Sequence, residues 1–148
     1  MASIIRDFKP EDFETLWGID QECFPPGISY SRQELKSYIN RRGAFTLVVS
    51  DPTAGGAAGF IVVQGGATGH VITIDVVEAH RRSGMGSQLL QAAEDRLRAA
   101  GCGSVGLETA VDNLAALAFY KRHGYNVIRI WPRYYSNGVD ALVMKKEL

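Results

Sequence analysis

The loop between residues 78 and 86 carries the residue types best suited to binding an anion. It reads Glu-Ala-His-Arg-Arg-Ser-Gly-Met-Gly and joins an apolar run, which ends at Val77, to an amphipathic run that begins at Ser87. The first turn of a helix leaves backbone N–H groups without partners and carries a partial positive charge. Glycines let the main chain approach a ligand closely, and Arg81 and Arg82 add charged donors. Together these features are typical of a pyrophosphate-binding loop.

The spacing of the glycines excludes the two most familiar phosphate loops. A dinucleotide fingerprint would need a third glycine where the sequence has Leu89, and no Gly-Lys-Ser or Gly-Lys-Thr ending of a nucleoside-triphosphate loop occurs. What remains is Arg-x-x-Gly-x-Gly, from Arg81 to Gly86. Taken alone, these six residues are explained equally well by a surface loop with glycines for turning and arginines for solubility.

Glu108 and Tyr120 are the two other side chains whose placement could support chemistry. Glu108 occupies a predicted central strand, where a carboxylate needs a reason. Tyr120 shares one face of a predicted helix with Asn113 and with Ala116 or Leu117, because these positions recur at helical spacing. From the residues alone, Tyr120 could be a core aromatic with its hydroxyl at the surface. Glu108 could be a glutamate that is solvated at a strand end or paired with an arginine.

Hydrophobic periodicity predicts an α/β domain that positions these residues. The expected strands cover residues 3–8, 44–50, 57–64, 70–77, 103–109, 125–132 and 139–146, and the expected helices cover 10–24, 31–40, 87–100 and 113–122. Short glycine-rich connections predict an antiparallel meander of the second to fourth strands, and Asn137-Gly138 predicts the last turn. The order is β-α-α-β-β-β-α-β-α-β-β, which indicates a mixed, mostly antiparallel sheet flanked by helices.

Several polar residues of these helices have simple structural explanations. Ser31 and Glu34 have the spacing of a capping box at the second helix. The charges of the third helix, Glu94 among them, are expected on a solvated face. His123 stands near a helix C-terminus, where the helix dipole favours it. The three histidines are widely spaced and form no ligand pair, so we expect no metal site.

Composition indicates one cytoplasmic domain that spans residues 1–148. The 148 residues are 46% hydrophobic and 22% charged, and 16 Lys and Arg balance 16 Asp and Glu. No net positive field is available to attract nucleic acid or an anionic membrane. Cys23 and Cys102 are too few for a disulfide framework, and no secretion signal or membrane-spanning run is present. We expect a monomer or weak dimer that binds neither nucleic acid nor membrane.

The motifs resemble those of the GNAT superfamily of N-acetyltransferases, particularly the ribosomal-protein-alanine and protein N-terminal acetyltransferase branch. The residues from Arg81 to Gly86 resemble that family's acyl-coenzyme A pyrophosphate loop, Gln/Arg-x-x-Gly-x-Gly/Ala. Further matches follow in order: Leu-Glu-Thr-Ala-Val-Asp-Asn at residues 107–113, Ala-Phe-Tyr at 118–120, His-Gly-Tyr at 123–125, Arg-Tyr-Tyr at 133–135 and Gly-Val-Asp-Ala at 138–141. Several ordered matches favour the GNAT interpretation over an ordinary loop.

The resemblance implies direct acetyl transfer from acetyl-coenzyme A (acetyl-CoA) to an amine. In that family the counterpart of Glu108 removes a proton from the amine, directly or through water, and the counterpart of Tyr120 protonates the departing thiolate. Asn113 and the backbone of a separated strand hold the pantetheine arm. The cofactor-binding residues that the resemblance implies are Val76, Val77, Arg81, Arg82, Ser83, Gly84, Met85, Gly86, Ser87, Asn113, Ala116 and Tyr120.

Two aromatic loops indicate the acceptor. Phe24, Pro25 and Tyr30 resemble one wall of the family's peptide entrance, and Tyr134 and Tyr135 resemble the opposite wall. The resemblance thus implies a protein or peptide N-terminal α-amine as acceptor, with a ribosomal protein as one candidate. The same aromatics could simply pack within their loops.

Three alternative functions stay open at this point. The acceptor could be a small amine, such as a polyamine or amino acid, or it could be a lysine side chain. A non-catalytic acyl-CoA sensor would also keep the cofactor loop, although it would not need both Glu108 and Tyr120.

Overall fold

Seven strands of one sheet run through the part of the chain that the computed structural model describes, residues 3–53 and 55–148. The strands are β1 (Ile4–Asp7), β2 (Ala44–Ser50), β3 (Ala57–Gln64), β4 (Gly69–Val76), β5 (Ser104–Ala110), β6 (Asn126–Trp131) and β7 (Ala141–Glu147). The helices are α1 (Phe13–Cys23), α2 (Arg32–Ile39), α3 (Met85–Ala99) and α4 (Leu114–Arg122), with single 3₁₀ turns at Pro10–Asp12 and Glu78–His80. This order confirms the predicted α/β fold class.

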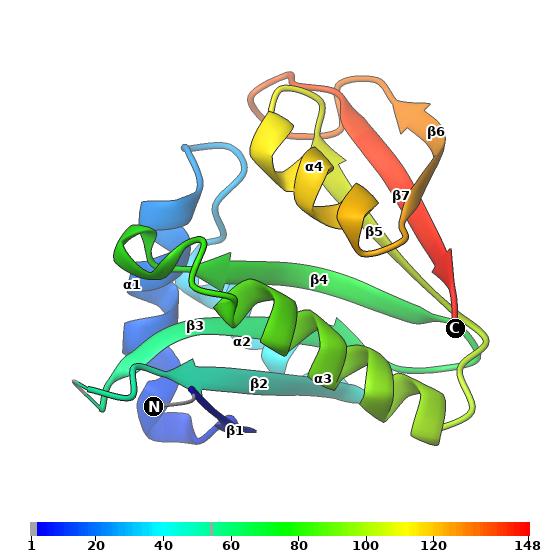
Figure 1. The fold of residues 1–148 in the computed structure, drawn as a ribbon. Helices are drawn as coiled ribbons and strands as arrows, with labels where there is room; N and C mark the ends of the chain where they lie inside the picture. The colour runs from blue at the N-terminus through cyan, green and yellow to red at the C-terminus, as the bar shows by residue number, and fades with distance from the viewer. Residues whose placement is uncertain (1–2, 54) are drawn as a thin grey trace.

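The sheet has the order β1-β2-β3-β4-β5-β7-β6, and its pairs are antiparallel except for β4 and β5. These two parallel strands pair at Gly69 with Val105 and at His70 with Gly106, and the described residues show no pairing between them beyond these. Figure 1 shows β4 and β5 diverging, with α4 covering β5 on the near side. The strand that leads to the anion-binding loop therefore leaves the sheet partner that carries Glu108.

Helices cover both faces of the sheet, with α3 and α4 on one side and α1 and α2 on the other (Figure 1). Strand β3 shows how alternation divides the core. Ile61 packs in the cluster of Leu89 and Leu90 from α3, whereas its neighbour Phe60 packs with Leu16 from α1. Because both faces are covered, β2 and β3 are nearly continuous apolar runs. The two cores hold β4 in place between the helices.

Most predicted boundaries agree with the structure to within two residues. Ser31 caps α2 as expected: its hydroxyl accepts from the Glu34 N–H at 3.1 Å, and its own N–H donates to the Glu34 carboxylate at 2.9 Å. Helix α3 begins at Met85 rather than Ser87, directly after Gly84, whose φ of 87° ends the loop. Strand β7 begins at Ala141, two residues after the predicted start, because the Asn137-Gly138 turn lies within a longer loop.

The expectation that Glu94 lies on a solvated face is wrong. It is 2% exposed and accepts hydrogen bonds from the Tyr125 hydroxyl and the Lys146 ammonium, both at 2.8 Å. Glu94 stands four residues after Leu90 and three before Leu97, so it belongs to the helix face that carries the apolar stripe. A buried charge needs such partners. Through them α3 is joined to the segments around β6 and β7.

No helix in residues 3–53 and 55–148 is long and apolar enough to cross a membrane. Within the same residues, His, Cys, Asp and Glu form no group of three or more that could hold a metal ion. Cys23 and Cys102 are both free thiols.

Candidate active site

A cleft of about 1210 Å³ lies where β4 and β5 separate. Its walls come from β4, the anion-binding loop, β5, α4 and the two aromatic loops. This volume is somewhat larger than that of a typical small-molecule site. The cleft is therefore large enough for an extended ligand together with an acceptor.

The anion-binding loop has the backbone geometry of an anion site. Arg82 and Gly84 both have left-handed φ values, 67° and 87°, and the left-handed region is unusual for a residue other than glycine. The N–H groups of Met85, Gly86 and Ser87 have no hydrogen-bond acceptor within the described chain. A Cβ on Gly84 would point into open space. Such free N–H groups and alternating backbone conformations form concave anion sites, which fits a pyrophosphate.

Val76 and Val77, where β4 ends, differ in their relation to the cleft. Val76 lines the cleft, and its carbonyl accepts from the Arg81 Nε at 3.1 Å and from the Cys23 thiol at 3.4 Å. The Val77 N–H instead donates to the Ala58 carbonyl at 2.9 Å, and its carbonyl accepts from the His80 N–H at 3.0 Å. The expectation that Val77 has free backbone groups was therefore wrong, because the chain turns back toward β3 before reaching the loop.

Two predicted loop residues also face away from the cleft. Met85, the first residue of α3, has its side chain buried in the core. The Ser83 hydroxyl donates to the His80 carbonyl. Ser87 does line the cleft, and its hydroxyl lies 2.9 Å from His123 Nε2. Burial lowers the pKa of His123, so the imidazole favours its neutral form. His123, the C-cap of α4, therefore also contacts the start of α3 through its side chain.

Helix α4 presents the predicted stripe of Asn113, Ala116 and Tyr120 to the cleft. Asn113 is the N-cap: its Oδ1 accepts from the Ala116 N–H at 3.2 Å, which fixes the side chain. Tyr120 is 7% exposed, and burial raises its pKa. The described residues provide no hydrogen-bond partner for its hydroxyl. The phenol is thus a neutral proton donor that borders the cleft.

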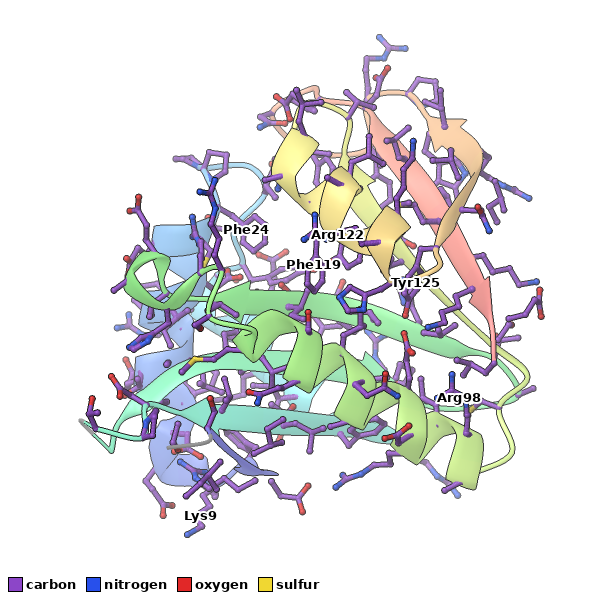
Figure 2. The ribbon with its side chains drawn as sticks, in the orientation of Figure 1. Lys9, Phe24, Arg98, Phe119, Arg122 and Tyr125 are labelled. Atoms are coloured by element: carbon purple, nitrogen blue, oxygen red, sulfur yellow. The ribbon has the colours of Figure 1, made fainter. Side chains whose placement is uncertain are left out.

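Phe119 and Arg122, which the sequence analysis did not select, also border the cleft. Phe119 reaches from α4 toward the start of α3 (Figure 2), and a Cβ on Gly86 would lie 3.4 Å from its ring. That distance is an ordinary van der Waals contact, so Phe119 packs closely on Gly86 without excluding a Cβ there. Arg122 adds a third cation to Arg81 and Arg82 along the cleft.

Glu108 is held by a histidine that sequence reasoning missed. His70 Nε2 lies 2.9 Å from both oxygens of the Glu108 carboxylate, and the Tyr134 hydroxyl donates to it at 3.4 Å. The Glu108 side chain is 14% exposed. His70 stands at the last pairing position before β4 and β5 separate. The pattern of β4 could suggest which face His70 occupies, but no local signal places it beside Glu108.

The aromatic loops lie where the acceptor was expected. Phe24, Pro25, Tyr30 and Tyr135 line the cleft, whereas Tyr134 takes part through its hydrogen bond to Glu108. The rings of Tyr134 and Tyr135 meet edge to face at 5.0 Å. Four of the predicted acceptor residues thus line the cleft that also contains Glu108, and the fifth bonds to Glu108.

The two loops also touch each other. The Ser136 hydroxyl donates to the Gly27 carbonyl at 3.0 Å. Gly27 has a φ of 90°, and a Cβ there would lie 2.9 Å from the Asn137 backbone nitrogen. Only glycine accommodates both conditions. The contact joins the two aromatic loops next to Asn137, which lines the cleft.

Comparison with known proteins identifies the class to which this fold and cleft belong. The chain matches the GNAT acetyltransferase family over residues 13–125 and belongs to it. It is an acetyltransferase that uses acetyl-CoA. The cofactor fits the cleft, because the free N–H groups and arginines of the loop suit its pyrophosphate.

Two relatives are similar to this chain over at least three quarters of its length. The chain is 32% identical to an uncharacterised N-acetyltransferase of Methanocaldococcus jannaschii, over 97% of this chain and 91% of the relative. It is 32% identical to N-alpha-acetyltransferase 30 of Schizosaccharomyces pombe, over 76% and 77% of the two chains.

Solved structures agree with this assignment. Ard1 from Thermoplasma volcanium superposes with a TM-score of 0.90 at 30% identity, covering 100% of this chain and 99% of that one. A chain of the NatC complex bound to Gag peptide and CoA shares the fold, with a TM-score of 0.86 at 24% identity, over 100% and 99% of the two chains.

Proposed function

We propose that this enzyme acetylates the α-amine of a protein or peptide N-terminus, with Glu108 as proton acceptor and Tyr120 as proton donor. The observation that carries this choice is the chemistry of the walls around Glu108. Phe24, Pro25 and Tyr30 on one side and Tyr135 on the other are uncharged. Of the other carboxylates that line the cleft, Asp75 is buried, Glu78 belongs to the anion-binding loop and Asp112 precedes α4. The flat walls with hydroxyl groups suit a peptide.

The cofactor supplies an acetyl thioester when it is bound. For its pyrophosphate, the loop offers the N–H groups of Met85, Gly86 and Ser87, with Arg81 and Arg82 as charged donors. For the pantetheine arm, Asn113 offers its amide NH₂, and Val76 lines the same part of the protein's cleft. Ser83 and Val77 contribute to the shape of the loop rather than to binding.

Glu108 prepares the acceptor by taking a proton from its ammonium group, directly or through water. A free α-amine has a pKa of about 7.7–8.0, against about 10.4 for lysine, so a carboxylate can suffice for the α-amine near neutral pH. His70 keeps both Glu108 oxygens oriented, and Tyr134 adds a donor from the opposite loop. The amine nitrogen then forms the new bond to the acetyl carbon.

Tyr120 completes the transfer by protonating the sulfur that leaves. Because burial raises its pKa, Tyr120 keeps its proton until it is needed. A phenol can donate to a thiolate, since thiols of this kind have a pKa of about 8.5. The ammonium group loses two protons in all, and the carbon–sulfur bond breaks as the carbon–nitrogen bond forms. The first proton is on Glu108, and the second replaces the one that Tyr120 gives to the released thiol.

The relatives support this acceptor. The S. pombe relative is named an N-alpha-acetyltransferase, and the Thermoplasma neighbour at 30% identity is Ard1. We infer that residues 1–148 act as one catalytic unit.

A screen of acceptors tests the proposal. Peptides with different free N-termini, including a ribosomal-protein N-terminus, are incubated with acetyl-CoA beside a polyamine, free amino acids and an N-blocked lysine peptide. We expect thiol release and a mass gain of one acetyl group for α-amino peptides. Efficient acetylation of the polyamine or lysine alone would replace the acceptor, and cofactor binding without any transfer would favour the sensor.

A further inference from the structure

Two carboxyl groups that the proposed reaction does not use are wholly buried between α1 and β4. Asp20 from α1 is 0% exposed, and Asp75 from β4, which is among the residues that line the cleft, is 1% exposed. Asp20 Oδ2 accepts from the Tyr30 N–H at 2.7 Å, and Asp75 Oδ1 accepts from the Thr73 hydroxyl. The other oxygen of each group meets no donor from the described residues. Burial of an unpaired acceptor is costly, so these oxygens need an explanation.

The two buried carboxyl groups lie close enough for each to act on the pKa of the other, and we call them the carboxyl dyad. Carboxylates only accept hydrogen bonds, so a bond between two of them requires a shared proton. Burial raises the pKa of Asp75 well above its usual range, and the adjacent Asp20 raises it further. Asp20 is raised less, because its bonds to Asp75 and Tyr30 favour its charged form. The two carboxyl groups therefore share one proton, and the dyad carries a single negative charge.

The surroundings of the dyad offer one cation to offset a second negative charge. Glu34 on α2 adds repulsion, while Arg81 from the anion-binding loop opposes it. Cys23 on α1 is a neutral thiol, since burial raises its pKa to about 11. Burial also raises the pKa of Tyr30 and of Tyr120 on α4, so both phenols are neutral. Loss of the dyad proton would therefore leave two facing carboxylates in the interior.

The dyad holds one wall of the proposed acceptor site through Tyr30. Its N–H donates to Asp20, and its carbonyl accepts from Trp17 Nε1 at 3.1 Å and Gln21 Nε2 at 2.7 Å. Its hydroxyl donates to the Ile72 carbonyl on β4 at 3.3 Å. The loop that contains Tyr30 is thus tied to α1 and to β4, and the tie to Asp20 is the charged one.

We propose that the carboxyl dyad, carrying a single proton, positions the Tyr30 wall against β4, so that losing the proton weakens acceptor binding without a comparable loss of cofactor binding. Asp20 and Asp75 are positioning residues in this scheme, because neither is assigned a contact with substrate. The acceptor part rests on the proposed function, since it takes Tyr30 as an acceptor wall. The claim that the dyad positions the loop containing Tyr30 does not depend on the proposed function.

Three variants separate the states of the dyad. In Asp75→Asn the amide NH₂ replaces the shared proton permanently, while the amide oxygen can still accept from Thr73. Asp20→Ala removes the acceptor for the Tyr30 N–H. Glu22→Ala, an exposed carboxylate on the same helix, is the matched control. Circular dichroism confirms that each variant is folded.

The first readout is amide hydrogen exchange of residues 24–30 between pH 6 and 10, expressed as protection relative to an unstructured peptide. A carboxyl with a raised pKa loses its proton as pH rises, so the effect belongs on the alkaline side. We expect wild type and Glu22→Ala to lose about tenfold in protection as pH rises, as for one lost charged hydrogen bond. Protection in Asp75→Asn should not change with pH, and protection in Asp20→Ala should be low at every pH.

The second readout is the split between acceptor KM and cofactor Kd. Acceptor KM should mirror the exchange profile, rising about tenfold where protection falls, while cofactor Kd changes by less than about threefold. An alkaline loss in Asp75→Asn equal to that in wild type, a flat wild-type profile to pH 10, or full protection in Asp20→Ala would overturn the proposal. If α-amino peptides are inert, the proposed acceptor fails while the exchange profiles still decide the role of the dyad.

Discussion

The proposed cofactor side and the proposed acceptor side of the cleft are built in different ways. The cofactor side is a contiguous loop whose donors are backbone N–H groups at the start of α3. The acceptor side gathers Tyr30, His70, Glu108 and Tyr135 from four distant segments. A local backbone site tolerates changes in side chains but not in backbone conformation, whereas a gathered site depends on each side chain. The two halves should therefore respond differently to substitution.

The largest effect is expected at Glu108, on the acceptor side. Glu108→Gln keeps the shape of the side chain but removes the proton acceptor, so kcat/KM for a peptide should fall about a thousandfold. Cofactor Kd, measured by calorimetry, should stay within about twofold because Glu108 is not part of the loop. Loss of cofactor binding in this variant would show that the two halves are not separable.

Gly84→Val should have the opposite signature on the cofactor side. A β-branched residue is strained at a φ of 87°, and its side chain would enter the open space in front of the loop. Cofactor Kd should rise about a hundredfold. Gly101→Val is a matched control, since Gly101 has a φ of 89° and the same open surroundings outside the cleft lining. Equal affinity in both variants would remove the loop from the cofactor site.

Tyr120→Phe should act on chemistry alone, with kcat falling about fiftyfold and cofactor Kd unchanged. Burial raises the pKa of Tyr120, so its donor form persists up to and beyond pH 10. Ionisation of Tyr120 should therefore cause no decline in the kcat of the wild-type enzyme below pH 10. Any decline in that range should also be present in Tyr120→Phe. Undiminished turnover in the variant would assign Tyr120 to packing.

His70→Ala is expected to cost about tenfold in kcat/KM, since it leaves the Glu108 carboxylate with one donor fewer. His70→Gln should recover part of this loss, because its amide can donate to the same carboxylate. A His70→Ala enzyme as active as wild type would show that the orientation of Glu108 does not depend on β4.

The smallest effect is expected at the acceptor wall. Tyr135→Ala removes one flat apolar surface and should raise peptide KM about fivefold, with cofactor Kd unchanged. Removing Tyr134 as well would also take a donor from Glu108, so the double variant should lose kcat in addition. Equal loss of cofactor affinity in Tyr135→Ala would contradict the separation between the two sides.

Differences between expectation and structure fall where contacts are long-range. The charge of Glu94 predicts a solvent-exposed position, although its spacing places it on the same helix face as Leu90 and Leu97. The partners that stabilise it in the core, Tyr125 and Lys146, come from later in the chain. Val77 was given free backbone groups because strand alternation says nothing about the turn that pairs it with Ala58.

The sequence by itself determined the order of elements, the loop at the start of α3 and the family, because periodicity, caps and motif spacing are encoded in neighbouring residues. The tertiary structure alone decided that β4 parts from β5 beyond His70, that His70 meets Glu108 and that Asp20 meets Asp75. Alternation along a strand shows which face a side chain takes, but not which strand or helix lies beside it. That choice depends on how the two cores pack around the sheet.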